Sequence, residues 1–354
     1  MERRGYNFVT VICMVVGVGL SLYVSRVHAA VTLPPEDKPL KRHFYKKLKT
    51  CANVEAFVKH QVELWWDKDK SITAKLLKLL YADCMVNGCD GSILLDGPQA
   101  EKNATKNSRL DGFILIDKIK KVVEARCPGA VSCADILMLS VRDAVHLAGA
   151  PSYPVFLGRR DGLESKAAWV DLPSPSVSWE EGYAYFKSKG LDAQDYATLL
   201  GAHTLGKTHC EDINDRLYDY NKTQKADPTM SRLLLGKLRQ LCPSSSSSSP
   251  SSRKKSDKDP TFFLTDKNGD AYSFTNTYYS NVLSYDSVLG VDQQLLFNYN
   301  TSQLVLEYAE KFESFRREFT LSISRMGGLG VLTGKQGEIR KNCRLTNNNN
   351  PDIK

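Results

Sequence analysis

Beyond its first residues, the sequence lacks long hydrophobic runs that could hold the chain in a membrane. After residue 24 no apolar run approaches the length of about 20 residues that a membrane-spanning helix needs. Before that point, Arg3 and Arg4 precede an apolar run over residues 8–24, and small residues follow at Ala29 and Ala30. This order is typical of a secretory signal peptide. We therefore predict that residues 1–29 are removed and the chain is secreted; a retained membrane anchor is the less favoured interpretation.

A strong excess of charge of either sign is also missing. The formal net charge is +8, and removal of residues 1–29 leaves 45 basic and 39 acidic residues, a net charge of +6. This balance does not predict binding to nucleic acid. It favours, weakly, an acidic partner such as a pectin-like polysaccharide.

No free thiol is expected in the mature chain. Cys13 lies in the segment predicted to be removed, and eight cysteines remain. An even number in an exported chain is typical of disulfides rather than of metal thiolates. Spacing alone leaves their pairing open. The eight are Cys51, Cys84, Cys89, Cys127, Cys133, Cys210, Cys242 and Cys343.

Oxygen-bearing side chains are concentrated in one short stretch. From Asp83 to Ser92 the sequence has two aspartates, a serine, two glycines and two cysteines five residues apart. This composition suits a tight loop that offers oxygen ligands to a hard cation such as Ca²⁺. Apolar residues at helical spacing over 72–80 predict a helix before the loop. Lys78 and Ala82, four residues apart, then share one face of that helix.

Several motifs together resemble the secretory plant haem peroxidases (class III). Residues 78–92 are similar to the distal helix and calcium loop of that family, and residues 199–206 to the helix that carries its haem ligand. The resemblance extends from about His43 to Cys343. It implies a mostly α fold in a haem peroxidase domain over 30–354, with two helical lobes and haem b between a distal and a proximal helix.

The resemblance implies a role for each matching residue. His203 would bind the haem iron, and Asp292 would hold its other ring nitrogen. Asn107 matches the residue that orients a distal histidine, and Pro173 borders the substrate opening. Glu101 would support the calcium loop, whose matching ligands are Asp83, Val86, Gly88, Asp90 and Ser92.

Disulfide partners and a second cation site also follow from the resemblance. Thr204 matches a ligand of a proximal Ca²⁺, but Thr275 stands in place of an aspartate. A second Ca²⁺ is therefore doubtful, because ligand charge sets affinity. The implied disulfides are Cys51 with Cys127, Cys84 with Cys89, Cys133 with Cys343, and Cys210 with Cys242.

The sequence departs from the family at the two residues that carry peroxide chemistry. Lys78 replaces an arginine and Ala82 replaces the distal histidine. Alanine cannot take or return a proton, a task that contributes roughly 10²–10⁴-fold to a rate. Lysine keeps the charge but lacks the planar fork of arginine. None of the other histidines lies on this helix face: His43, His60, His146 and His209.

Three interpretations remain open. The favoured one is a secreted, monomeric haem protein whose oxidation of phenolic donors by hydrogen peroxide is weak or absent. The second is an active peroxidase with an unusual proton carrier, such as water held by Asn107 or Tyr81. The third is a haem-free wall-binding module that uses glycans and a basic stretch in residues 244–259, a Ser/Lys-rich insertion predicted to be disordered. Glycosylation sequons occur at Asn103, Asn221 and Asn300.

Overall fold

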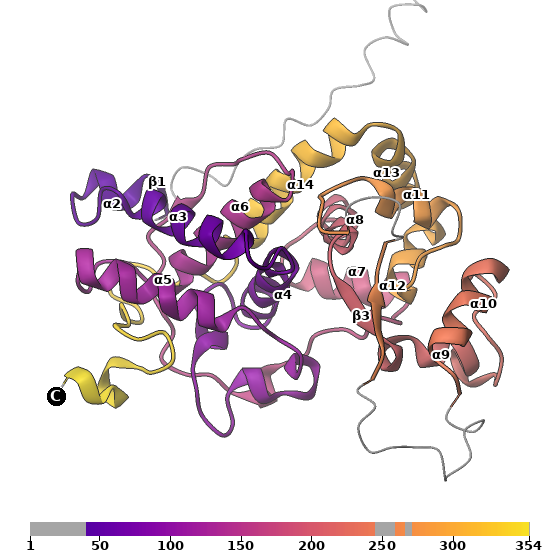
Figure 1. The fold of residues 1–354 in the computed structure, drawn as a ribbon, viewed down its shortest axis with the longest axis horizontal. Coiled ribbons are helices and arrows are strands. Elements are labelled where there is room, and N and C mark those ends of the chain that lie inside the picture. The colour runs from indigo at the N-terminus through magenta and orange to yellow at the C-terminus, as the bar shows by residue number, and fades with distance from the viewer. Residues whose placement is uncertain (1–39, 245–258, 266–270, 354) are drawn as a thin grey trace, which may run out of the picture. The chain divides into compact units, whose positions relative to one another are not determined.

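The computed structural model describes residues 40–244, 259–265 and 271–353, all within one compact unit, Glu36–Lys354. The predicted signal peptide and residues 245–258 of the predicted insertion lie outside the described residues. Helices dominate, and the strands of the described part form two antiparallel pairs (Figure 1). These are β1 (Lys41–Arg42) with β2 (Phe156–Leu157), and β3 (Lys207–His209) with β4 (Thr261–Phe263). The predicted mostly α fold is confirmed.

The first group of helices packs around α6. Helix α6 is buried at every residue from Cys133 to Val145, which is typical of a helix inside a core rather than on its surface. Helices α3 and α4 both contact it, and α3 also contacts α5 (Figure 1). The bounds are α2 (Phe44–Lys47), α3 (Val54–Trp66), α4 (Ile72–Cys84), α5 (Phe113–Arg126) and α6 (Cys133–Leu147).

A second group of helices has an aromatic core. The rings of Tyr279, Tyr308 and Phe315 lie 4.9–5.8 Å apart between α8, α11, α13 and α14. Such ring pairs add about 0.5–1.5 kcal/mol beyond the area that they bury. The bounds are α7 (Trp179–Ser188), α8 (Ala193–Leu200), α9 (Asn214–Tyr218), α10 (Arg232–Leu241), α11 (Thr277–Leu283), α12 (Gly290–Gln293), α13 (Tyr299–Glu310) and α14 (Phe312–Met326).

A buried arginine joins the two groups. Arg159 donates to the Asp135 carboxylate of α6 at 2.7 Å and to the carbonyl of Gly327, at the end of α14, at 3.0 Å. Both side chains are at most 2% exposed, so each buried charge depends on the other for compensation. Throughout the described ranges, every helix is too short or too polar to cross a bilayer.

All four predicted disulfides are present. Cys84–Cys89 closes the loop at the end of α4, and Cys133–Cys343 joins the start of α6 to a segment 210 residues later. Each cross-link restricts the unfolded chain and is typically worth about 2–4 kcal/mol. The other two bridges are Cys51–Cys127 and Cys210–Cys242.

Candidate functional site

His203 lies in a short 3-10 turn, Gly201–Thr204, that continues α8. The turn packs tightly on the aromatic core, since a Cβ at Gly201 would come within 2.6 Å of the Phe315 ring. His203 Nδ1 is 2.8 Å from Asp292 Oδ1, and Asp292 is only 4% exposed. The carboxylate therefore fixes the ring so that Nε2 is the free nitrogen. No described residue bonds to Nε2, and 32% of the side chain is accessible.

The charge of Asp292 controls the imidazole. Burial lowers the pKa of His203, but the carboxylate and its hydrogen bond outweigh burial, so that the pKa is raised above its usual value. Lys78 opposes this rise, which places its ammonium within electrostatic reach of the ring. A histidine held by a buried carboxylate, with one nitrogen free, has the donor set that a haem iron requires.

Tyr278 is a second donor to Asp292 that the sequence did not reveal. Its hydroxyl is 2.9 Å from the same Oδ1 that accepts from His203. A second donor stabilises the carboxylate and weakens its pull on the imidazole proton.

We predict that Tyr278→Phe lowers the reduction potential of the haem-loaded protein by about 20–60 mV, because one hydrogen bond is worth about 0.5–1.5 kcal/mol. Removing the hydroxyl leaves Asp292 Oδ1 to accept from His203 without a competing donor, which makes His203 more electron-donating. Potentiometric titration measures the change. Tyr279→Phe is the matched control, since the Tyr279 hydroxyl donates to the Ala197 carbonyl instead. A rise in potential, or equal shifts in both variants, would contradict the assignment.

Lys78 and Ala82 lie one turn apart on α4, as the sequence predicted. Burial lowers the pKa of the Lys78 ammonium; Asp212 raises it and Arg109 lowers it further. The side chain nevertheless has accessible surface. Ala82 is only 1% exposed, so little free space adjoins its methyl group.

Asn107 carries an unpartnered acceptor. Its Nδ2 donates to the Glu101 carbonyl at 2.9 Å, while Oδ1 is buried without a hydrogen-bond partner. A buried polar atom left in this way costs about 1–3 kcal/mol. This is the state expected of the residue that orients a distal histidine when position 82 is alanine.

Three carboxylates crowd together in the predicted calcium loop. Asp83 accepts from the N–H groups of Gly91 and Ile93, at 3.0 and 3.3 Å. Burial and then the Asp90 charge raise the pKa of Asp83 well above its usual range, and the same two causes raise the pKa of Glu101 to about 7. Mutual repulsion of buried carboxylates is relieved by a cation, so these residues fit Ca²⁺.

Side chains alone do not complete this cation site. Within the described ranges, no three His, Cys, Asp or Glu side chains are close enough to hold a metal ion by themselves. Ser92 Oγ and the carbonyls of Val86 and Gly88 would have to contribute. Val86 O already accepts from Lys189 Nζ and Gly88 O from the Asp90 N–H, both at 2.9 Å. Each carbonyl keeps a second lone pair for a cation.

We predict that a calcium chelator lowers the melting temperature by about 5–10 °C at pH 7.5. The loss should be smaller at about pH 5. Without a cation the raised pKa of Glu101 makes its ionisation unfavourable in the fold, so stability falls as pH rises from about 4.5 to about 7. Differential scanning calorimetry at both pH values, with added Mg²⁺ as the control, tests this. If the chelator leaves the melting temperature unchanged at pH 7.5, the assignment of a calcium site to this loop is wrong.

The proximal cation position, doubtful from the sequence, has no carboxylate among the described residues. Thr204 Oγ1 is 3.1 Å from Thr275 Oγ1, and the Thr204 carbonyl accepts from Thr265 Oγ1 at 3.0 Å. Thr275 also donates to Thr277. The two Thr204 oxygens thus already have neutral partners, and no carboxylate among the described residues joins them.

The predicted substrate edge is crossed by charged contacts. Arg109 bonds Glu211, Asp212 at 3.1 Å and Asp259 at 3.2 Å. Nearby, Lys106 donates to the carbonyl of Leu172, next to the half-buried Pro173. The three carboxylates come from segments far from Arg109 in the sequence.

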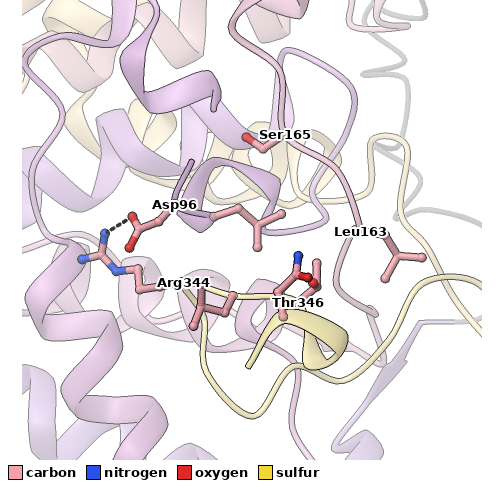
Figure 2. Close-up of a pocket in the computed structure, with 8 residues that line it drawn as sticks. Asp96, Leu163, Ser165, Arg344 and Thr346 are labelled. Carbon is pink, nitrogen blue, oxygen red and sulfur yellow. Dashed lines mark hydrogen bonds and ion pairs between the residues drawn. The ribbon is translucent and has the colours of Figure 1, made fainter. Parts of the chain in front are cut away.

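A hollow of about 120 Å³ lies elsewhere, between Leu163 and Thr346 (Figure 2). Arg344 faces it, but its guanidinium pairs with Asp96 at 3.4 Å and Asp117 at 2.8 Å. The Arg344 charge is therefore already compensated within the chain.

The helical fold and the carboxylate-held histidine agree with the arrangement that the resemblance to plant haem peroxidases implies. The sequence profile described as Peroxidase matches residues 58–311. The chain is 55% identical to "Probable peroxidase 26" of Arabidopsis thaliana, over 96% of this chain and 98% of that protein. It is 55% identical to "Probable peroxidase 61", over 91% and 93%, and 39% identical to "Peroxidase 28", over 87% and 93%, both of the same plant. The chain belongs to the plant peroxidase family.

Proposed function

We propose that this chain is a secreted haem-binding protein whose hydrogen-peroxide-dependent oxidation of phenolic donors is weak or absent. The observation that supports this most directly is the contrast between two sites. The proposed proximal site has both of its residues, His203 and Asp292, in hydrogen-bond contact. On the distal helix α4, in contrast, Ala82 occupies the position where the family has its proton-transferring histidine.

Haem b, when bound, would supply an iron that binds peroxide and exchanges electrons with it. His203 would hold the iron through Nε2, and Asp292 would keep that ring oriented and electron-donating. Asp83, Asp90 and Ser92 would fix the end of α4 through one Ca²⁺. These residues bind and orient; none of them moves a proton at the iron.

The facing helix lacks a group suited to proton transfer. Ala82 has no titratable group. Lys78 retains a positive charge that can stabilise the negative charge of a leaving group. Its ammonium is a point charge, however, and lacks the planar, bidentate geometry of the arginine guanidinium. Burial raises the pKa of the neighbouring Tyr81 phenol further above its ordinary value, so the phenol stays protonated at neutral pH and no phenolate is available to act as the base.

An active peroxidase with an unusual proton carrier is the second candidate. The buried, unpartnered Oδ1 of Asn107 favours it, because such an atom can hold a water molecule. A haem-free wall-binding module is the third candidate, and the free Nε2 of His203 weighs against it.

One experiment separates the three candidates. The mature protein is mixed with haem, and its absorption spectrum is recorded before and after hydrogen peroxide is added. We expect a histidine-bound haem spectrum that changes slowly with peroxide, together with little oxidation of a phenol such as guaiacol. Rapid spectral change with turnover would favour the second candidate. Failure to take up haem would favour the third and would contradict our proposal.

Secretion and surface chemistry complete the proposal. The predicted signal peptide and the four disulfides support an exported, extracellular or vacuolar protein. The sequon residues Asn103, Asn221 and Asn300 are all exposed, as glycosylation requires. A monomer is proposed.

A further inference from the structure

The end of helix α7 contacts the predicted calcium loop through a lysine. Lys189, the residue that follows α7, donates from its Nζ to the Val86 carbonyl at 2.9 Å. That carbonyl is one of the oxygens that the family resemblance implies as ligands of Ca²⁺. A positive charge of the chain itself therefore lies against an oxygen that a divalent cation would use.

Lys189 is held in this position by its neighbours. Only 21% of its side chain is accessible, and its ammonium lies 3.9 Å from the Asp171 carboxylate and 5.0 Å from the centroid of the Tyr185 ring. The Tyr185 hydroxyl donates to the Met85 carbonyl at 2.6 Å and to Asp171 at 3.0 Å. The carbonyls of residues 85 and 86, directly after α4, thus both accept from side chains at the end of α7. The contact is therefore part of a fixed arrangement.

The ammonium of Lys189 does not neutralise the acidic groups of the loop by pairing with them. Among the described residues its ion pair is with Asp171, whereas Glu101, with 0% exposure, keeps Oε1 buried and without a partner. Carbonyl oxygens bind Ca²⁺ at about 2.3–2.6 Å, so an ion on Val86 would lie at most about 5.5 Å from the ammonium. At this distance the repulsion corresponds to about tenfold in a binding constant, even with the dielectric constant of bulk water.

We propose that Lys189 is a built-in competitor of Ca²⁺ that sets the calcium affinity of the loop. Without Ca²⁺, the ammonium gives the Val86 carbonyl a hydrogen bond. When Ca²⁺ binds, the same ammonium repels it. Both effects act in one direction, so the lysine lowers the affinity. The proposal rests on the calcium site proposed for this loop, and it concerns the regulation of that site rather than the chemistry at haem.

Calcium titration by isothermal titration calorimetry tests the proposal on the mature protein, after bound metal has been removed with a chelator and the chelator washed away. Lys189→Met removes the charge and the donor but keeps an unbranched side chain. We expect it to bind Ca²⁺ at least about tenfold more tightly than the parent at low ionic strength. Lys189→Arg keeps the charge and should stay within about threefold of the parent.

Lys187→Met is the matched control. It removes the same charge two residues earlier, from an exposed position in the last turn of α7. Its calcium affinity should also stay within about threefold of the parent, because solvent screens an exposed charge.

Melting temperatures give a second readout that a purely structural cross-link would not produce. Lys189→Met loses the hydrogen bond to Val86 in the calcium-free protein, while Ca²⁺ still occupies that carbonyl in the loaded protein. Chelation should therefore lower the melting temperature more in Lys189→Met than in the parent. A lysine that served only as a cross-link would lower both melting temperatures by the same amount.

The possible failures are distinguishable. Calcium binding by Lys189→Met that equals the parent's or is weaker would overturn the proposal and leave the calcium site in place. Equal tightening in Lys187→Met or in Lys189→Arg would also overturn it, because the effect would then not come from the charge at residue 189. If neither the parent nor Lys189→Met binds Ca²⁺, the calcium site itself is wrong and the proposal falls with it. Circular dichroism of each variant verifies that the fold is intact.

Discussion

The Lys78→Arg, Ala82→His double variant is expected to react with hydrogen peroxide about 10²-fold faster than the parent protein, the lower end of what a placed acid-base group supplies. α4 presents both positions on one face. The unpartnered Oδ1 of Asn107 is available to accept from a new imidazole. Stopped-flow mixing of the haem-loaded variant with peroxide measures the rate.

The single variants give this experiment its control. Ala82→His alone should give most of the gain, because it returns the proton carrier. Lys78→Arg alone should give little, since charge stabilisation helps only when the proton can move. Because Ala82 is 1% exposed, an imidazole there must displace its neighbours, at a cost of about 1–3 kcal/mol in stability. A double variant with the parent's rate would show that the rest of the pocket no longer supports the reaction.

The second large effect concerns haem retention. His203→Ala is expected to lose haem or to bind it at least about 10²-fold more weakly, since the iron would lose its ligand from the chain. Haem titration followed by absorption, and mass spectrometry under non-denaturing conditions, measure occupancy without relying on activity.

Asp292→Asn is the matched control for this loss. It should keep haem and raise the reduction potential, a change opposite in sign to the one expected for Tyr278→Phe. The neutral amide accepts a weaker hydrogen bond from His203 than the carboxylate does, so the imidazole donates less electron density. Unchanged haem occupancy in His203→Ala would show that the ligand assignment is wrong.

The fold and the disulfides were predictable because they depend on local patterns and on a resemblance that runs along the chain. Helix α4, with Lys78 and Ala82 on one face, followed from residue spacing. All four cysteine pairs agreed with the family pattern. The lack of a titratable group at Ala82 was also visible, since it is a property of sequence alone.

Contacts between distant segments were not predictable. Arg109 meets Glu211, Asp212 and Asp259, which lie 102 to 150 residues away, so no local pattern marks the cluster. Tyr278 reaches Asp292 from another helix. The sequence showed that Thr275 replaces an aspartate, but not that the hydroxyls of Thr275 and Thr265 contact the two oxygens of Thr204. Each case depends on how the chain returns on itself.

The disulfide connectivity also has a consequence for the order in which the chain can mature. Cys84–Cys89 and Cys210–Cys242 join cysteines that are consecutive in the sequence, so each can close as soon as both partners have left the ribosome. Cys84 and Cys89 are synthesised between Cys51 and its partner Cys127. Likewise, Cys210 and Cys242 are synthesised between Cys133 and its partner Cys343. Pairing in order of emergence would therefore give wrong bridges. Correct maturation therefore depends either on early closure of the two consecutive pairs, which leaves Cys51 for Cys127 and Cys133 for Cys343, or on later thiol–disulfide exchange.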